Sequence, residues 1–90
     1  MPKSTSKLAS KEDVQLSFGL AVRAYRDERQ LTQEQLADFC DMHVTYISQI
    51  ERGLKNVSLF NIHRLAYALG VAPSELLVTS HEQAPGARHE

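Results

Sequence analysis

The sequence has one cysteine, Cys40, which excludes an internal disulfide and any multi-cysteine zinc site. No apolar run approaches the ~18–20 residues that a membrane-spanning helix needs, and the basic first residues lack the apolar segment of a secretory signal. Ten basic residues stand against eleven acidic ones, which argues against indiscriminate coating of nucleic acid but leaves a locally basic face open. These absences predict a soluble cytoplasmic protein without a membrane partner.

The sequence also lacks the residue patterns that are usual for catalysis and ligand binding. The four histidines do not have metal-ligand spacing, and no cysteine or acid completes a set with them. No nucleophile is paired with a base, and the four glycines form no phosphate-cradling loop. At 90 residues there is no room for a separate ligand-binding domain. We therefore expect no enzymatic activity, no metal, no cofactor and no small-molecule ligand.

What the sequence does have is helical periodicity. Apolar residues make up 42% and charged residues 23%, an ordinary globular mixture, and no window alternates with the period of a strand. We therefore expect one all-α domain over residues 11–78. Residues 1–10, which hold lysines and no acid, predict a flexible basic arm, and residues 79–90 predict a flexible tail.

Start and stop signals divide this domain into five short helices. They are expected at about residues 10–29, 33–40, 44–52, 59–69 and from 73 onward. Their predicted caps or first residues are Ser10, Thr32, His43, Ser58 and Pro73. Apolar residues at helical spacing predict the shared core: Val14, Phe18, Ala21, Val22, Tyr25, Leu36, Ala37, Cys40, Met42, Ile47, Ile50, Leu59, Ile62, Leu65, Ala66, Leu69 and Leu76.

The most informative stretch is residues 31–53. Two helices of about two turns each are separated there by residues 41–43, and so short a link forces the sharp crossing of a helix-turn-helix. The second helix of the pair keeps a short, neutral outward face, which suits base edges in a major groove. That face consists of Val44, Thr45, Ser48 and Gln49.

Three strings, LTQEQLA, TYISQIERG and LFNIHRLAYALGVAPSELL, lie between about residues 18 and 77, in an order and at a spacing that need no gap to match a known family. In this order the chain resembles the Cro/C1-type, or XRE, family of helix-turn-helix regulators from bacteria and phages. HVTYISQIERGLKNVSLFNI is similar in particular to the controller proteins of restriction–modification systems. The resemblance implies a compact five-helix bundle of the lambda-repressor type. It also implies double-stranded DNA as the partner and a homodimeric transcriptional regulator on a palindromic operator.

The resemblance also implies roles for particular residues. The residues placed in the major groove would be Val44, Thr45, Ser48 and Gln49. Those that hold the DNA backbone would be Gln33, Tyr46, Arg52, Lys55 and Asn56. Thr45 and Gln49 are the favoured base readers, because the first reaches a base edge or a thymine methyl and the second pairs with adenine. Arg26 and Glu51 would form a structural ion pair between the first and third helices.

The chain departs from the family pattern at the turn. Asp41 stands where the family commonly has glycine, and aspartate tolerates the left-handed conformation better than most residues. His43 replaces the usual serine or threonine cap, which predicts a weaker helix start. Controller proteins often carry arginine at the position of Val44, and its absence leaves the operator sequence open.

Each of these signals has a plainer alternative. Outside this pattern, the polar residues of the two helices would be ordinary solvated surface. Residues 52–64 hold three bases and no acid, which favours phosphate contact but also fits a solvated charge run. Residues 32–51 hold four acids and no base, so attraction for DNA must come from the flanks. Cys40 is expected to be a small core residue.

The fourth helix carries more apolar side chains than its own core requires. Phe60, His63 and Tyr67 follow at spacings of three and four residues, and with Leu77 and Val78 they would form an apolar patch. We interpret this patch as a homodimer interface, while a wider buried face or coverage by the C-terminal tail is the plainer explanation. A dimer would place two recognition helices one DNA turn apart, at ~34–36 Å.

A competing interpretation comes from a different class of protein. The net charge of -1 and the acidic helix pair also fit a protein-interaction module, or an antitoxin-like partner, that keeps the helix-turn-helix fold without specific DNA binding. The sequence leaves open the regulated gene, activation against repression, a controller against a phage-type or antitoxin-type role, and any DNA contact by the N-terminal arm.

Overall fold

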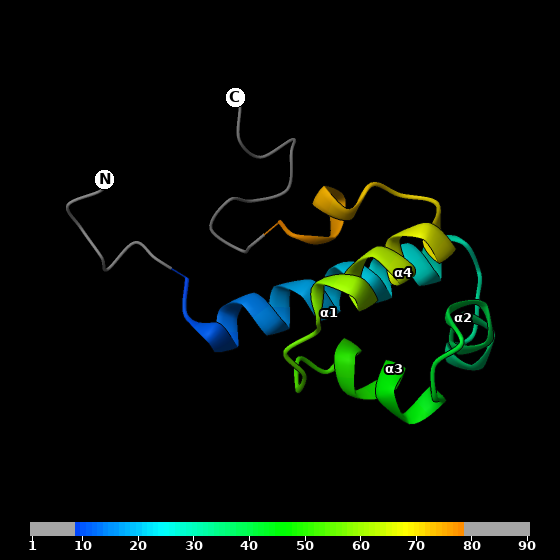
Figure 1. Cartoon of the computed structure of the whole chain (residues 1–90), viewed down its shortest axis with the longest axis horizontal. Coiled ribbons are helices and arrows are strands. Elements are labelled where there is room, and N and C mark those ends of the chain that lie inside the picture. Colours follow the sequence, from blue (N-terminus) through cyan, green and yellow to red (C-terminus); the bar gives the residue numbers. More distant parts are fainter. Residues whose placement is uncertain (1–8, 79–90) are drawn as a thin grey trace.

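The computed structural model describes residues 9–78, and most of the expected arm and all of the expected tail lie outside this range. The described chain forms four α-helices and one 3₁₀ turn, with no strand (Figure 1). These elements are α1 (Lys11–Glu28), α2 (Gln33–Cys40), α3 (Val44–Glu51), α4 (Leu59–Leu69) and the 3₁₀ turn η2 (Pro73–Leu76). The all-α prediction is therefore confirmed. Within residues 9–78, no helix is both long and apolar enough to cross a membrane.

The helices begin where the capping residues predict. The Ser10 hydroxyl accepts a hydrogen bond from the backbone N–H of Asp13 at 3.0 Å. Thr32 and Gln35 form a reciprocal capping box, with bonds of 3.0 and 2.8 Å between each side chain and the other residue's backbone N–H. The Ser58 hydroxyl caps α4 as Ser10 caps α1, by accepting a hydrogen bond from the backbone N–H of Asn61 at 3.1 Å. Each cap satisfies backbone donors that the first helical turn leaves without a partner.

The prediction of five helices is corrected by the structure to four α-helices and η2. Pro73 starts the last element as expected, and the Glu75 carboxylate accepts a hydrogen bond from the Ala72 backbone N–H at 2.8 Å. The element then closes with bonds between residues three apart, such as Leu77 N to Ser74 O at 3.1 Å. So few residues do not complete the turns that make an α-helix stable, whereas a 3₁₀ turn needs only one such bond.

The core lies where the helices meet, with α3 and η2 both packed against α1 and with α4 packed against α2 (Figure 1). Its buried members are Phe18, Val22, Leu36, Ala37, Cys40, Ile47, Ile50, Leu65, Ala66, Leu69 and Leu76. Two predicted core residues are wrong: Leu59 is 70% exposed and Val14 is 41% exposed. Both lie in the first turn of their helices, and periodicity predicts which face is apolar but not how far the neighbouring elements extend along it.

Gly19 brings α1 and α3 into close contact. It is buried in the middle of α1, and a Cβ at this position would collide with the backbone carbonyl oxygen of Ile50 and lie 3.0 Å from the carbonyl carbon of Glu51. Only glycine therefore allows the end of α3 to rest directly on the backbone of α1. This contact sets how closely α3 packs against α1.

Candidate nucleic-acid interface

The turn between α2 and α3 has the left-handed conformation predicted for it. Asp41 has φ 55° and ψ 48°, and it ends α2. The N–H of Met42 donates to the carbonyl of Ala37 at 2.9 Å and the N–H of Asp41 donates to that of Asp38 at 3.2 Å, which is the pattern of a Schellman motif. After this tight stop, α3 starts at Val44 and crosses α2 closely, so residues 33–51 form a helix-turn-helix.

The start of α3 is held weakly, as the histidine cap predicts. Nδ1 of His43 accepts a hydrogen bond from the Thr45 backbone N–H at 3.4 Å, which is longer than the bonds at the serine and threonine caps. An imidazole nitrogen accepts such a bond only in the unprotonated state.

One side of α3 is buried and the other faces outward. Ile47 and Ile50 are fully buried against the core. Thr45 is exposed, and the other residues of the predicted base-reading face are half-buried: Val44, Ser48 and Gln49. Because residues three and four apart lie on one helix face, Thr45, Gln49 and the exposed Arg52 form one continuous outward row. The row carries hydrogen-bonding groups along the helix and a positive charge at its end.

Three of the residues predicted to contact the DNA backbone lie at the end of this row and beyond it. Arg52, Lys55 and Asn56 are all exposed at the end of α3 and in the following loop. Among residues 9–78, neither Arg52 nor Lys55 forms an ion pair. Tyr46 is half-buried, and its hydroxyl accepts a hydrogen bond from Nδ2 of Asn61 at 3.3 Å, so α4 holds this side chain in place.

Glu51 joins three helices at one buried carboxylate. Arg26 of α1 donates to it from Nε at 2.6 Å and from Nη2 at 3.0 Å, and Gln33 of α2 donates from Nε2 at 3.0 Å. The hydrogen bond with Glu51 raises the pKa of Arg26 above its ordinary value, so the guanidinium stays charged. Gln33 is thus partnered within the chain, and because an amide nitrogen carries two hydrogens, its second N–H takes no part in this bond.

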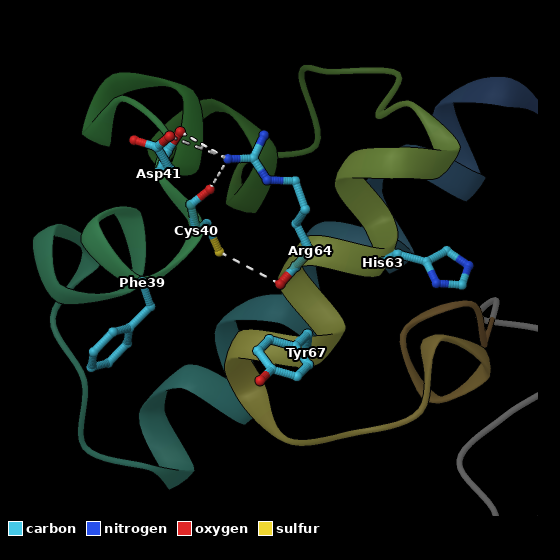
Figure 2. Close-up of a pocket in the computed structure, with 6 residues that line it drawn as sticks. All are labelled: Phe39, Cys40, Asp41, His63, Arg64 and Tyr67. Carbon is cyan, nitrogen blue, oxygen red and sulfur yellow. Dashed lines mark hydrogen bonds and ion pairs between the residues drawn. The ribbon is translucent and has the colours of Figure 1, made fainter.

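Arg64 of α4 is a residue whose place the sequence did not indicate. It belongs to the basic stretch expected to face phosphate, yet its Nη2 donates to the backbone carbonyls of Cys40 and, at 3.1 Å, of Asp41. Figure 2 shows the guanidinium lying against the end of α2. The signal that could have revealed it is the last turn of α2, which contains no basic residue of its own to bind its free carbonyls.

Comparison with known proteins identifies the fold. Residues 22–76 match the helix-turn-helix family HTH_3. The chain is 52% identical over 66 residues to the control protein C.BamHI of Bacillus amyloliquefaciens, a match that covers 72% of this chain and 82% of that protein. This chain belongs to the helix-turn-helix family of DNA-binding transcriptional regulators.

Two solved structures of helix-turn-helix proteins are similar to the chain. The restriction-modification controller protein C.AhdI from Aeromonas hydrophila has 42% sequence identity and a TM-score of 0.67, covering 69% of this chain and 94% of that one. The biofilm regulator SinR, solved in complex with DNA, has 30% identity and a TM-score of 0.64, covering 67% and 97%.

Three residues of the predicted apolar patch of this helix-turn-helix protein lie on α4, and the other two directly follow η2. Phe60 is 69% exposed and Tyr67 is 89% exposed, with His63 between them and also exposed. Leu77 is 46% exposed, and Val78 is half-buried. An open hollow of about 460 Å³ lies beside Tyr67 (Figure 2). Its lining adds Phe39 of α2, which is 64% exposed and was not predicted to belong to this surface.

Proposed function

We propose that this regulator binds double-stranded DNA as a homodimer on a palindromic operator and acts as the controller of a restriction–modification system. The observation that carries the proposal is the outward row of α3, which joins neutral hydrogen-bonding side chains to a basic end. The likeness to two control proteins, at 52% and 42% identity, favours the controller role over that of a phage-type repressor.

The base-reading step uses the middle of α3. With α3 in the major groove, the amide of Gln49 can form two hydrogen bonds with an adenine, and Thr45 can contact a base edge or a thymine methyl. Val44 and Ser48 lie beside them on the same helix face and complete the contact surface. The Val44 side chain is apolar, so the interaction it can offer is contact with a thymine methyl.

The DNA backbone would be bound by the two ends of the helix-turn-helix. The N-terminus of α2 directs free backbone N–H groups outward, and the second N–H of the Gln33 amide can join them on one phosphate. Arg52, Lys55 and Asn56 can hold a phosphate at the other end, with the Tyr46 hydroxyl as a further donor. Because Arg52 and Lys55 have no acidic partner within residues 9–78, binding phosphate breaks no ion pair.

Dimerisation would use the apolar patch, which consists of Phe60, His63, Tyr67, Leu77 and Val78. A two-fold axis through this patch buries the same side chains on both copies. It also sets the two α3 helices about one DNA turn apart, ~34–36 Å, so that one dimer reads two half-sites. A single copy reads too few base pairs to select one site in a genome.

The test is fluorescence anisotropy of duplexes from the region upstream of the protein's own gene, against scrambled duplexes, over a salt series. We expect at least ~10³-fold preference for the natural duplex, and a fall in log affinity of about 0.9 per neutralised phosphate as log salt rises. Equal, weak binding to both duplexes would favour the protein-interaction module. A reporter fused to the bound promoter then separates activation from repression.

A further inference from the structure

Arg64 reaches from α4 to the end of α2 and makes several contacts there. Its Nη2 donates to the backbone carbonyls of Cys40 and Asp41, and it lies 3.9 Å from the Asp41 carboxylate (Figure 2). Its guanidinium carbon lies 5.3 Å from the centre of the Phe60 ring, a cation–π distance. The side chain is 29% exposed, and these contacts direct its donors to carbonyl oxygens of the chain.

The end of α2 needs such a donor. The last carbonyls of a helix have no partner within the helix and carry its negative dipole end, which a cation stabilises. The last turn of α2 has no basic residue. Its cap, Asp41, is held in the left-handed region at φ 55°, a conformation that costs a residue with a Cβ more than it costs glycine.

The same side chain is linked to α3. Nη1 of Arg64 donates to Oδ1 of Asn61 at 3.4 Å, and Nδ2 of Asn61 donates to the hydroxyl of Tyr46 at 3.3 Å. Tyr46 lies in the first turn of α3, two residues after the helix starts. The linked side chains of Arg64 and Asn61 on α4 therefore hold both the end of α2 and the beginning of α3, on either side of the turn between them.

We propose that Arg64 is a positioning residue for DNA recognition, which sets the angle of α3 by holding the turn at Asp41. The inference rests on the proposed function, because it concerns how accurately α3 enters the groove. Base contacts depend on that angle, whereas contacts with phosphate tolerate a small rotation. Loss of Arg64 therefore lowers discrimination between sequences while general DNA affinity stays the same.

The experiment measures the ratio of affinities for the natural and the scrambled duplex at one salt concentration. Arg64→Met should lower this ratio about tenfold or more, the size of one good base contact, with unchanged affinity for the scrambled duplex. Asp41→Gly relieves the left-handed cap, so Arg64→Met added to Asp41→Gly should lower the ratio clearly less than it does alone. Arg64→Lys, which keeps the charge but not the planar fork, should fall between.

Val22→Ala is the control for simple loss of stability, since Val22 is fully buried in α1 and is not part of the turn or of the hydrogen bonds of Arg64. It should lower the melting temperature and leave the ratio unchanged. An unchanged ratio in Arg64→Met, an equal loss of affinity for both duplexes, or an equal fall in Val22→Ala would each overturn the inference. If Arg64→Met does not fold, Arg64→Lys decides by the same ratio. A wild-type protein without any preference overturns the proposed function itself, before a variant is made.

Discussion

Arg26 and Glu51 are joined by two parallel hydrogen bonds, of 2.6 and 3.0 Å, that tie α1 to the end of α3. The Glu51 side chain is only 3% exposed and that of Arg26 only 11%. Bidentate geometry gives such a pair its strongest form, but removing both charges from water carries a large desolvation cost. The folding stability of the protein is therefore far more sensitive to the loss of one of the two charges than to the loss of both.

Arg26→Met is expected to lower the free energy of unfolding by about 3–5 kcal/mol, because it leaves the Glu51 carboxylate buried without its cation. The double variant Arg26→Met with Glu51→Leu should recover much of this loss. Urea unfolding followed by circular dichroism measures both. Arg23→Met is the matched control, since Arg23 and Asp27 are 3.8 Å apart and both largely exposed. Equal losses in the two arginine variants would contradict the prediction.

Gly19→Ala is expected to destabilise the protein, although the same change in an exposed helix stabilises by about 1 kcal/mol. The added methyl meets the Ile50 carbonyl, so α1 and α3 must separate at a cost of about 1–3 kcal/mol. Thermal unfolding gives the sign directly. Ala24→Gly, at an exposed position of the same helix, should lose only about 1 kcal/mol. A raised melting temperature in Gly19→Ala would show that the helices move apart freely.

Gln49→Ala and Lys55→Ala are expected to weaken DNA binding in different ways. The first should reduce affinity for the natural duplex and leave the scrambled duplex unaffected, because an amide reads a base edge. The second should weaken both duplexes alike and lower the salt slope by about one. Anisotropy titrations over the salt series measure each quantity. If neither change alters binding to the natural duplex, α3 does not enter the groove in the proposed way.

Tyr67→Asp is expected to convert dimers to monomers, because it places a charge within the proposed interface. Sedimentation equilibrium reports the mass. Leu20→Asp makes a comparable change at a residue of α1 that is 56% exposed and lies outside the patch, and it should leave the dimer intact. A dimer mass retained by Tyr67→Asp would remove the patch from the dimer interface.

Cys40 predicts a particular dependence of stability on pH. Burial raises the pKa of its thiol, against a smaller lowering by the nearby charge of Arg64. The folded state therefore favours the protonated thiol, and this stabilisation is complete below the unfolded pKa of about 8.5 and is lost as pH rises towards the folded value. The unfolding free energy of wild type minus that of Cys40→Ala should fall between pH 8 and pH 10. A constant difference over that range would contradict the prediction.

Local chemistry made part of this fold predictable from the sequence. The capping box of Thr32 and Gln35 and the left-handed Asp41 involve residues close together in the chain, so their patterns carry the geometry. The basic stretch of residues 52–64 predicts that Arg64 faces phosphate, but its partners are backbone carbonyls 23 and 24 residues away, and the only sequence signal for them is the absence of a basic residue in the last turn of α2. The base preferences of Thr45 and Gln49 depend on how α3 docks on DNA, a property of two molecules that one sequence does not specify.

Apart from Val44 and Tyr46, which pack partly against the core, the two sides of α3 use different residues. Ile47, Ile50 and Glu51 hold the helix to the domain, while Thr45, Ser48 and Gln49 are directed outward. If this outward side reads the operator, as proposed, we expect substitutions there to change the preferred operator at little cost in folding free energy. A gene duplicate can acquire a new target site in single steps, without a compensating change in the core. Relatives with the same scaffold can in this way diverge into regulators that ignore one another's operators.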